Sequence, residues 1–286
     1  MKEKAKQKKK IKIITTILIV ILIILVICCC YEYTLKKDSN DAKNFIKDTT
    51  DNVINQNGKF NVIDMGIEDT ENLNHENSIN EIQKETNVVY ESERINKVQE
   101  LQNQNSDIVG WLEIPNTNIS YPILQAIDND YYMRRNYKKR ISRNGSLFLD
   151  KDYNWNKPSS NLLIYGHNNR GTNEMFVELL NYKDENYYKN HTIIRFTTEK
   201  EDAIYEIISV FLSRVYYKRE TDVFRYYYFI DAKNENEFNY YVNESKKASL
   251  YNIDATAEYG DQLITLSTCE YSQEDGRFVV VARKKK

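Results

Sequence analysis

Hydrophobic and polar positions divide the chain into three stretches with different patterns. Residues 13–30 form an uninterrupted apolar run without a charged side chain, IITTILIVILIILVICCC. Residues 31–87 are rich in Asn, Asp, Glu and Lys and have few apolar positions, a composition typical of a solvated stalk. From residue 88 onward apolar residues recur regularly, which predicts a folded domain over residues 88–286.

The folded stretch begins with a helical pattern and continues with extended ones. Val88, Ile95, Val98 and Leu101 are spaced for the buried face of an amphipathic helix over residues 88–104. Segments rich in β-branched and aromatic residues then predict eight short strands. These strands span residues 110–114, 120–124, 145–149, 161–165, 192–197, 203–217, 262–268 and 277–283, and the sixth is long enough to be broken or bent.

Helical patterns lie between the predicted strands, over residues 128–136, 175–180 and 235–249. Eight short strands in about 180 residues favour a barrel or a sandwich. The sequence therefore predicts a mainly β domain with helices inserted in its connections and one helix at its N-terminal end.

The apolar run predicts a transmembrane helix. At about 1.5 Å per residue, eighteen residues approach the thickness of a bilayer core. Seven lysines within residues 1–12 precede it, so the positive-inside rule places this basic tail in the cytoplasm and the rest of the chain outside. A cleaved signal peptide fits less well, because the run ends in Val26, Ile27 and three cysteines rather than in small residues. We expect a single-pass protein of the cell membrane with an extracytoplasmic domain.

Composition and charge narrow the class of protein. The 286 residues are 41% hydrophobic and 29% charged, which suits a globular domain, and only 8 Gly and 3 Pro exclude collagen-like or proline-rich architectures. The net charge of −2 combines +6 on residues 1–12 with −8 on the remaining residues. A basic end is thus followed by an acidic body, for which we expect no nucleic-acid partner.

The four cysteines are unevenly placed. Cys28, Cys29 and Cys30 end the apolar run and Cys269 stands alone near the C-terminus, a pattern that is no disulfide framework. Cys269 could be an inert buried thiol, one half of an intermolecular disulfide, or a nucleophile. It directly follows the strand LITLST and precedes the polar EYSQEDG, which places it at a strand end where a thiolate could meet solvent and substrate.

Arg277 and His167 are candidate partners of this thiol. If the last two strands form an antiparallel hairpin, the Arg277 guanidinium and the Cys269 sulfur lie at the same end of neighbouring strands. There Arg277 could stabilise a thiolate or an oxyanion, or it could simply pair with Glu270 or Asp275. His167 follows an apolar strand and a glycine in NLLIYGHN, and could protonate a leaving amine.

Other chemistries find no support in the sequence. Three scattered His residues and a single cysteine beyond residue 30 lack the clustering that a zinc site requires, so no metal is expected. Phosphate-binding and dinucleotide-binding glycine motifs are also missing, so no cofactor is expected.

Together these residues resemble the sortases, and class B most closely. TLSTC at 265–269, Arg277 at the start of RFVVVAR and His167 in YGHN carry the resemblance. GWLEIPNTNISYPILQ and DNDYY near the start of the domain, and the helix over 235–249, extend it to about residues 88–286. The resemblance implies a closed eight-stranded sortase-type β-barrel. It also implies a cysteine transpeptidase that joins secreted proteins to the cell wall of Gram-positive bacteria.

The resemblance also implies a role for each site residue. Cys269 would attack the carbonyl carbon of the Thr in a C-terminal sorting motif of the NPxTN, NPxTG or SPxTG type, forming a thioester. His167 would protonate the departing amine and then help to deprotonate the amine of a peptidoglycan precursor or cross-bridge. Arg277 would hold the substrate and the oxyanion, with the backbone N–H of Glu270 as a second donor. Ser267 and Thr268 would line the substrate groove.

Two other functions are compatible with the same residues. A cysteine protease would use them for hydrolysis only. A membrane-anchored binding module would use Cys269 structurally and form no thioester.

Overall fold

The computed structural model describes residues 15–17, 19–27, 29–30, 33, 89–169 and 171–286. The chain divides into two units, Met1–Ile67 and Glu68–Lys286. In the first unit the described residues are helical and exposed. The predicted cytoplasmic tail and nearly all of the predicted stalk lie outside the described residues, as do residues 13, 14, 18 and 28 of the predicted membrane helix. In the part of the chain that is described, no helix is long and apolar enough to cross a membrane.

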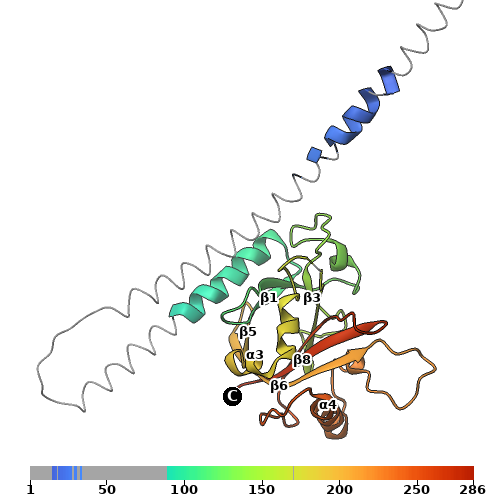
Figure 1. The fold of residues 1–286 in the computed structure, drawn as a ribbon. Coiled ribbons are helices and arrows are strands. Elements are labelled where there is room, and N and C mark those ends of the chain that lie inside the picture. Colours follow the sequence, from blue (N-terminus) through green and yellow to red (C-terminus); the bar gives the residue numbers. More distant parts are fainter. Residues whose placement is uncertain (1–14, 18, 28, 31–32, 34–88, 170) are drawn as a thin grey trace, which may run out of the picture. The chain divides into compact units, whose positions relative to one another are not determined.

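Eight strands in the second unit close into a barrel (Figure 1), which confirms the predicted fold class. Around the barrel they follow the order β1-β2-β3-β4-β7-β8-β6-β5, and β5 pairs with β1 to close it. Two neighbouring pairs, β2–β3 and β4–β7, are parallel and the others are antiparallel. The strands are β1 (Ile108–Glu113), β2 (Ser120–Leu124), β3 (Leu147–Leu149), β4 (Asn161–Gly166), β5 (Ile193–Thr197), β6 (Asp202–Arg214), β7 (Leu263–Cys269) and β8 (Gly276–Lys284).

Strand β8 is apolar on both faces because each face packs against a different core. Along β8, Phe278 and Val280 belong to the core inside the barrel, whereas Val279 and Val281 belong to an outer core. The outer core is completed by helix α4 (Glu235–Ala248), which packs along β6 and begins where the Asn234 side chain accepts the Glu237 N–H. Because successive side chains of a strand point to opposite faces, one strand contributes side chains to both cores.

Strand β6 was expected over residues 203–217 as a broken or bent segment, and it is a single strand with a bulge. Its pairing with β8 shifts between Ile207 and Ser209. Tyr205 and Ile207 point into the barrel before the shift, and Val210 does so after it, so the bulge moves the inward positions from odd to even residues. The strand ends at Arg214, earlier than predicted.

Two of the helical segments differ from the prediction in type and extent. The predicted helices over 128–136 and 175–180 are the 3₁₀ turns η1 (Tyr131–Arg134) and η2 (Glu178–Lys183). Of these, η1 is shorter than predicted, and η2 has the predicted length but begins three residues later. Two further segments, α3 (Glu185–Asn190) and η3 (Tyr226–Tyr228), were not predicted. Each is too short to show a helical period.

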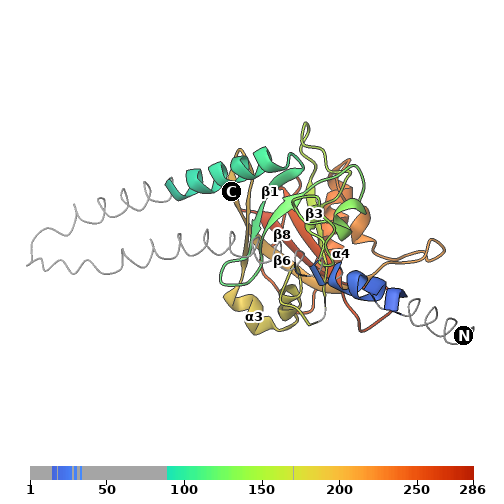
Figure 2. The same ribbon diagram turned by 90° about the horizontal axis from the view of Figure 1, so that it is seen from above.

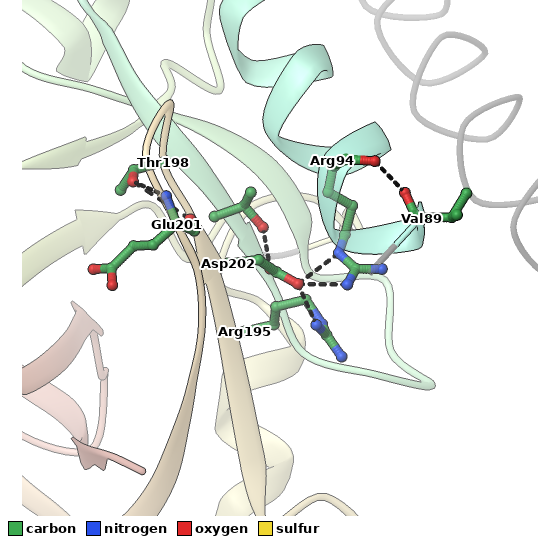
Figure 3. A network of polar contacts seen from close by, with 8 residues as sticks. Val89, Arg94, Arg195, Thr198, Glu201 and Asp202 are labelled. Carbon is green, nitrogen blue, oxygen red and sulfur yellow. Dashed lines mark hydrogen bonds and ion pairs between the residues drawn. The ribbon is translucent and has the colours of Figure 1, made fainter. Parts of the chain in front are cut away.

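The helix over residues 89–104 lies along the barrel beside β1 (Figure 2) and is held by a buried carboxylate. Asp202, at the start of β6, accepts hydrogen bonds from Arg94 Nε at 2.8 Å, Arg195 Nη1 at 2.6 Å and Thr197 Oγ1 at 2.6 Å (Figure 3). Burial opposes the charged form of Asp202, but the hydrogen bonds from Arg94 and Thr197 outweigh it and lower the pKa. Asp202 thus joins the helix, β5 and β6 through charge-assisted hydrogen bonds.

Candidate active site

The β7–β8 hairpin brings Cys269 and Arg277 together. The two strands pair antiparallel, and Cys269 is directly opposite Arg277 in the register, as the predicted hairpin requires. The connecting turn is tight: Asp275 has a φ of 52°, and a Cβ on Gly276 would meet the carbonyl oxygen of Glu270. The sulfur and the guanidinium are therefore carried by neighbouring strands at one end of the barrel.

His167 reaches the same end from β4. This strand pairs parallel to β7 with Gly166 opposite Thr268, so His167 follows β4 where Cys269 completes β7. Asn168 Nδ2 then donates to the carbonyl oxygen of Cys269 at 2.9 Å, which ties the two strand ends together. A Cβ on Gly166 would collide with the side chains of Leu147 and Phe176, so the position before the histidine requires glycine.

The His167 ring is oriented by η1. Its Nε2 lies 2.8 Å from the backbone oxygen of Met133. Because a carbonyl oxygen can only accept a hydrogen bond, this contact assigns a proton to Nε2.

The Arg277 guanidinium is not neutralised by either neighbouring acid. Its Nη1 donates to the backbone oxygens of Gly276 at 2.9 Å and Asp275 at 3.2 Å. Across the described residues, no carboxylate forms an ion pair with Arg277. The alternative in which Arg277 pairs with Glu270 or Asp275 is thus not what the structure shows, and its positive charge remains available to a bound anion.

Glu270 has a structural position instead. Its carboxylate forms an ion pair with Lys183 of η2 at 2.7 Å and accepts the Ser272 N–H at 2.9 Å. Burial favours the neutral acid, but the hydrogen bonds from Lys183 and Ser272 prevail and lower the pKa of Glu270 to about 2. Its backbone N–H donates to Gly276 O at 2.9 Å. The expectation that this N–H serves an oxyanion therefore needs correction, because the turn already uses the donor.

One cavity of about 280 Å³ is lined by all but one of the predicted residues. Its lining includes His167, Ser267, Thr268, Cys269 and Arg277, but not Glu270. The hydroxyls of Ser267 and Thr268 are used internally: that of Ser267 bonds Tyr226 OH at 2.7 Å, and that of Thr268 donates to Gly166 O at 2.8 Å. These two residues shape the wall of the cavity and hold the strand ends in register.

Aromatic and apolar residues complete the wall, and sequence reasoning missed them. They are Met133, Phe148, Tyr165, Val215, Tyr226 and Tyr227, and Asn129 adds a polar side chain to the same wall. Burial raises the pKa of Tyr165 and of Tyr226, so both phenols are neutral at physiological pH. Tyr165 OH donates to the buried Asp150 at 2.9 Å. The available signal was the aromatic run FRYYYF at 224–229, which lies in a connection rather than in a strand.

The arrangement combines a thiol nucleophile, an imidazole and an unneutralised guanidinium around an apolar cavity. Such a set can form a covalent bond to a carbonyl carbon, move a proton and stabilise a developing oxyanion. Among the residues that the structure describes, no group of three or more His, Cys, Asp or Glu side chains is placed to hold a metal ion.

Known proteins share this architecture. The sequence model of the sortase domain matches residues 112–285. Sortase B of Listeria monocytogenes serovar 1/2a (strain ATCC BAA-679 / EGD-e) is 37% identical over 188 residues, which cover 64% of this chain and 72% of that protein.

Two solved structures extend the comparison. The Staphylococcus aureus sortase B–substrate complex superposes with a TM-score of 0.58 at 30% identity, covering 67% of this chain and 85% of that one. A sortase B complexed with triglycine gives a TM-score of 0.60 at 28% identity, covering 76% of this chain and 99% of that one. The family match, the Listeria relative and the barrel agree with the resemblance first carried by TLSTC, and the chain belongs to the sortase family, class B.

Proposed function

We propose that this enzyme is a cysteine transpeptidase that cleaves a C-terminal sorting motif of the NPxTN, NPxTG or SPxTG type after its Thr. It then transfers the new C-terminus to a peptidoglycan amine. The observation that carries the proposal is the meeting of Cys269, His167 and Arg277 in one cavity at a shared barrel end. The substrate complex of the Staphylococcus aureus relative supports a peptide substrate, and triglycine bound to another sortase B supports an amine acceptor.

In the first step the Cys269 thiolate attacks the carbonyl carbon of the Thr. The tetrahedral intermediate carries a negative oxygen, which the Arg277 guanidinium stabilises. The C–N bond then breaks, His167 gives a proton to the departing amine, and a thioester with Cys269 remains.

In the second step the acceptor amine attacks the thioester carbon. His167 takes the proton that the amine loses, the C–S bond breaks, and the Cys269 thiolate is restored. Because the cycle needs a protonated His167 and an ionised Cys269 at its start, we expect a bell-shaped pH–rate profile.

The location of the enzyme follows from the sequence. The lysine-rich residues 1–12 and the apolar residues 13–30 support a single membrane anchor with the catalytic domain outside the cell. Its partners are then surface proteins with a C-terminal sorting signal and the cell-wall amine.

Cleavage of labelled sorting-motif peptides by the full chain tests the proposal. Cys269→Ala should abolish cleavage, and Cys29→Ala, a matched change of an exposed cysteine, should leave it intact. Arg277→Ala should lower kcat by about 10²- to 10³-fold, the usual effect of losing one oxyanion donor. Cleavage that survives Cys269→Ala would sink the mechanism.

Addition of triglycine separates transfer from hydrolysis. A transpeptidase yields a peptide joined to triglycine, detected by its mass, whereas a protease yields only the free carboxylate. If only the free carboxylate forms at saturating triglycine, the enzyme is a hydrolytic protease and not a transpeptidase.

A further inference from the structure

The connection between β2 and β3, green in Figure 1, concentrates positive charge next to the site. Residues 131–149 contain six Lys or Arg residues and no Asp or Glu, although residues 89–286 as a whole carry a net charge of −2. All six lie within residues 134–143, which we call the basic hairpin: Arg134, Arg135, Lys138, Lys139, Arg140 and Arg143. A positive segment on an acidic body creates a local field that attracts anions.

The basic hairpin is held in one conformation. Arg135 pairs with Ile141 across it, and Ser142 N donates to Arg134 O at 2.9 Å. At its tip, the Asn136 side chain accepts the backbone N–H of Lys138 at 3.0 Å, and Asn105 Nδ2 donates to Tyr137 O at 2.7 Å. The cations are thus presented from an ordered backbone, which limits the entropy lost when an anion binds.

Both ends of the basic hairpin attach to the segment that carries His167. At one end, the oxygen of Met133 accepts the hydrogen bond from His167. At the other, Asn169 Nδ2 donates to Asn144 Oδ1 at 2.9 Å. Lys138 is five residues from Met133, so the tip lies within about 17 Å of the cavity wall along the chain.

Among the described residues, four of these cations, Arg135 among them, form no ion pair with a carboxylate. Lys139 pairs with Asp107 at 3.0 Å, and the Arg135 guanidinium stacks over the Tyr131 ring at 4.3 Å. Arg134, Lys138 and Arg143 are exposed, and within the described part of the chain no carboxylate forms an ion pair with any of them. Clustered cations that include arginine suit a multiply charged phosphate, which accepts several charge-assisted hydrogen bonds.

We propose that the basic hairpin binds the phosphates of a diphosphate-bearing acceptor while the amine of that acceptor reaches the thioester on Cys269. This inference rests on the proposed function, in which His167 acts on the acceptor amine. A lipid-linked peptidoglycan precursor carries an amine and a diphosphate in one molecule, and the basic hairpin adjoins the residue that handles the amine. Triglycine lacks phosphate and cannot use this contact.

The test compares two acceptors on the full-length enzyme. In Arg134→Gln/Lys138→Gln/Arg143→Gln, the KM for a lipid-linked, diphosphate-bearing amine should rise about tenfold or more, as expected from losing even one hydrogen bond to a charged group. Peptide cleavage and transfer to triglycine should be unchanged. Lys200→Gln/Lys233→Gln/Lys247→Gln removes the same charge from exposed positions elsewhere and should leave both acceptors unaffected.

Inorganic pyrophosphate provides a second measurement. It should compete with the diphosphate acceptor in the wild type and lose this effect in the triple variant of the basic hairpin. The proposal would be overturned by an unchanged KM in the triple variant, or by an equal loss of transfer activity with both acceptors. It would also be overturned if the triple variant lost binding to phosphatidylglycerol vesicles but kept its competition by pyrophosphate. If the wild type cleaves no sorting peptide, the proposed function fails, and calorimetry with pyrophosphate still decides whether the basic hairpin binds phosphate.

Discussion

At the residue scale, Glu270 shows how one side chain fixes the turn that follows Cys269. Its carboxylate joins η2 through Lys183 and the turn through Ser272. This turn also sets the start of β8, where Arg277 lies. Glu270, which does not line the cavity, therefore positions Arg277, which does.

The lowered pKa of Glu270 predicts a pH-dependent contribution to stability. Because the pKa falls from its ordinary 4.5 to about 2 on folding, the ionised group stabilises the fold above about pH 4.5 and this contribution disappears as the pH falls toward 2. Glu270→Gln should lower the free energy of unfolding by about 1 kcal/mol at pH 7, allowing for the exposed side of Lys183. Urea unfolding at both pH values measures this.

Glu274→Gln is the matched control, since Glu274 is an exposed acid of the same turn. This substitution should leave the free energy of unfolding unchanged at pH 7 and at pH 2. A Glu270→Gln defect of equal size at pH 7 and pH 2 would contradict the linkage.

At the scale of elements, α4 braces the two strands that carry Cys269 and His167. Tyr241 on α4 is buried, stacks on Phe229 at 4.2 Å and forms a hydrogen bond with Thr265 Oγ1 on β7 at 2.7 Å. Thr265 Oγ1 in turn donates to Asn161 Oδ1 on β4 at 2.8 Å. One helix residue thereby connects α4, β7 and β4.

Adjacent tyrosines on α4 offer a matched pair of variants. Tyr241→Ala should lower the free energy of unfolding by about 3–5 kcal/mol, because it leaves a cavity in the outer core. Tyr240→Ala, at a side chain that is 58% exposed, should cost about 0.5 kcal/mol or less. Tyr241→Phe isolates the hydroxyl and should cost about 1 kcal/mol. Equal losses at positions 240 and 241 in chemical denaturation would refute the packing argument.

At the scale of the whole catalytic unit, Asp202 makes the helix over residues 89–104 part of the folded domain. It accepts from Arg94 on the helix and from Arg195 on β5, and its own side chain is 3% exposed. Without Asp202 both guanidinium groups would lose the carboxylate to which they donate, and Glu113 would be left as the acid that attracts them.

A double-mutant cycle tests this connection. Asp202→Ala should destabilise the chain by about 3 kcal/mol, as for a broken buried pair, and Arg94→Ala should cost less, because Arg195 still neutralises the carboxylate. The coupling energy between positions 94 and 202, measured by unfolding of both single variants and the double variant, should be about 1–3 kcal/mol. Strict additivity would mean that the helix docks independently of Asp202.

The sequence predicted the strands well because they are marked by local composition, whereas the choice of a closed barrel over a sandwich came from the resemblance to the sortases. All eight strands lie where β-branched and aromatic residues gather, with most ends correct to within two residues. The β6 bulge was not predictable in detail, because it depends on pairing with β8, a strand some 70 residues away. The six-residue α3 depends on the Asp184 side chain accepting the Asn186 N–H rather than on periodicity.

The reactive side chains of the site were predicted better than the residues that surround them. Hairpin geometry was enough to place Cys269 beside Arg277, whereas His167 was joined to them by the resemblance to the sortases, and their catalytic roles stay predictions. The hydrogen bond of the Glu270 N–H follows from the conformation of Asp275, which the sequence does not display. The aromatic wall depends on how the long connection after β6 folds back over the barrel, so Tyr226 and Tyr227 could be found only in three dimensions.

The parallel pairing of β4 with β7 has a consequence for folding kinetics. Asn168 and Cys269, whose contact joins the two strand ends, are 101 positions apart in the chain. Contacts of such sequence separation carry a large loop-closure entropy and form slowly. We infer that Cys269 and His167 meet late in folding, so that a newly made chain has no assembled site until its barrel has closed.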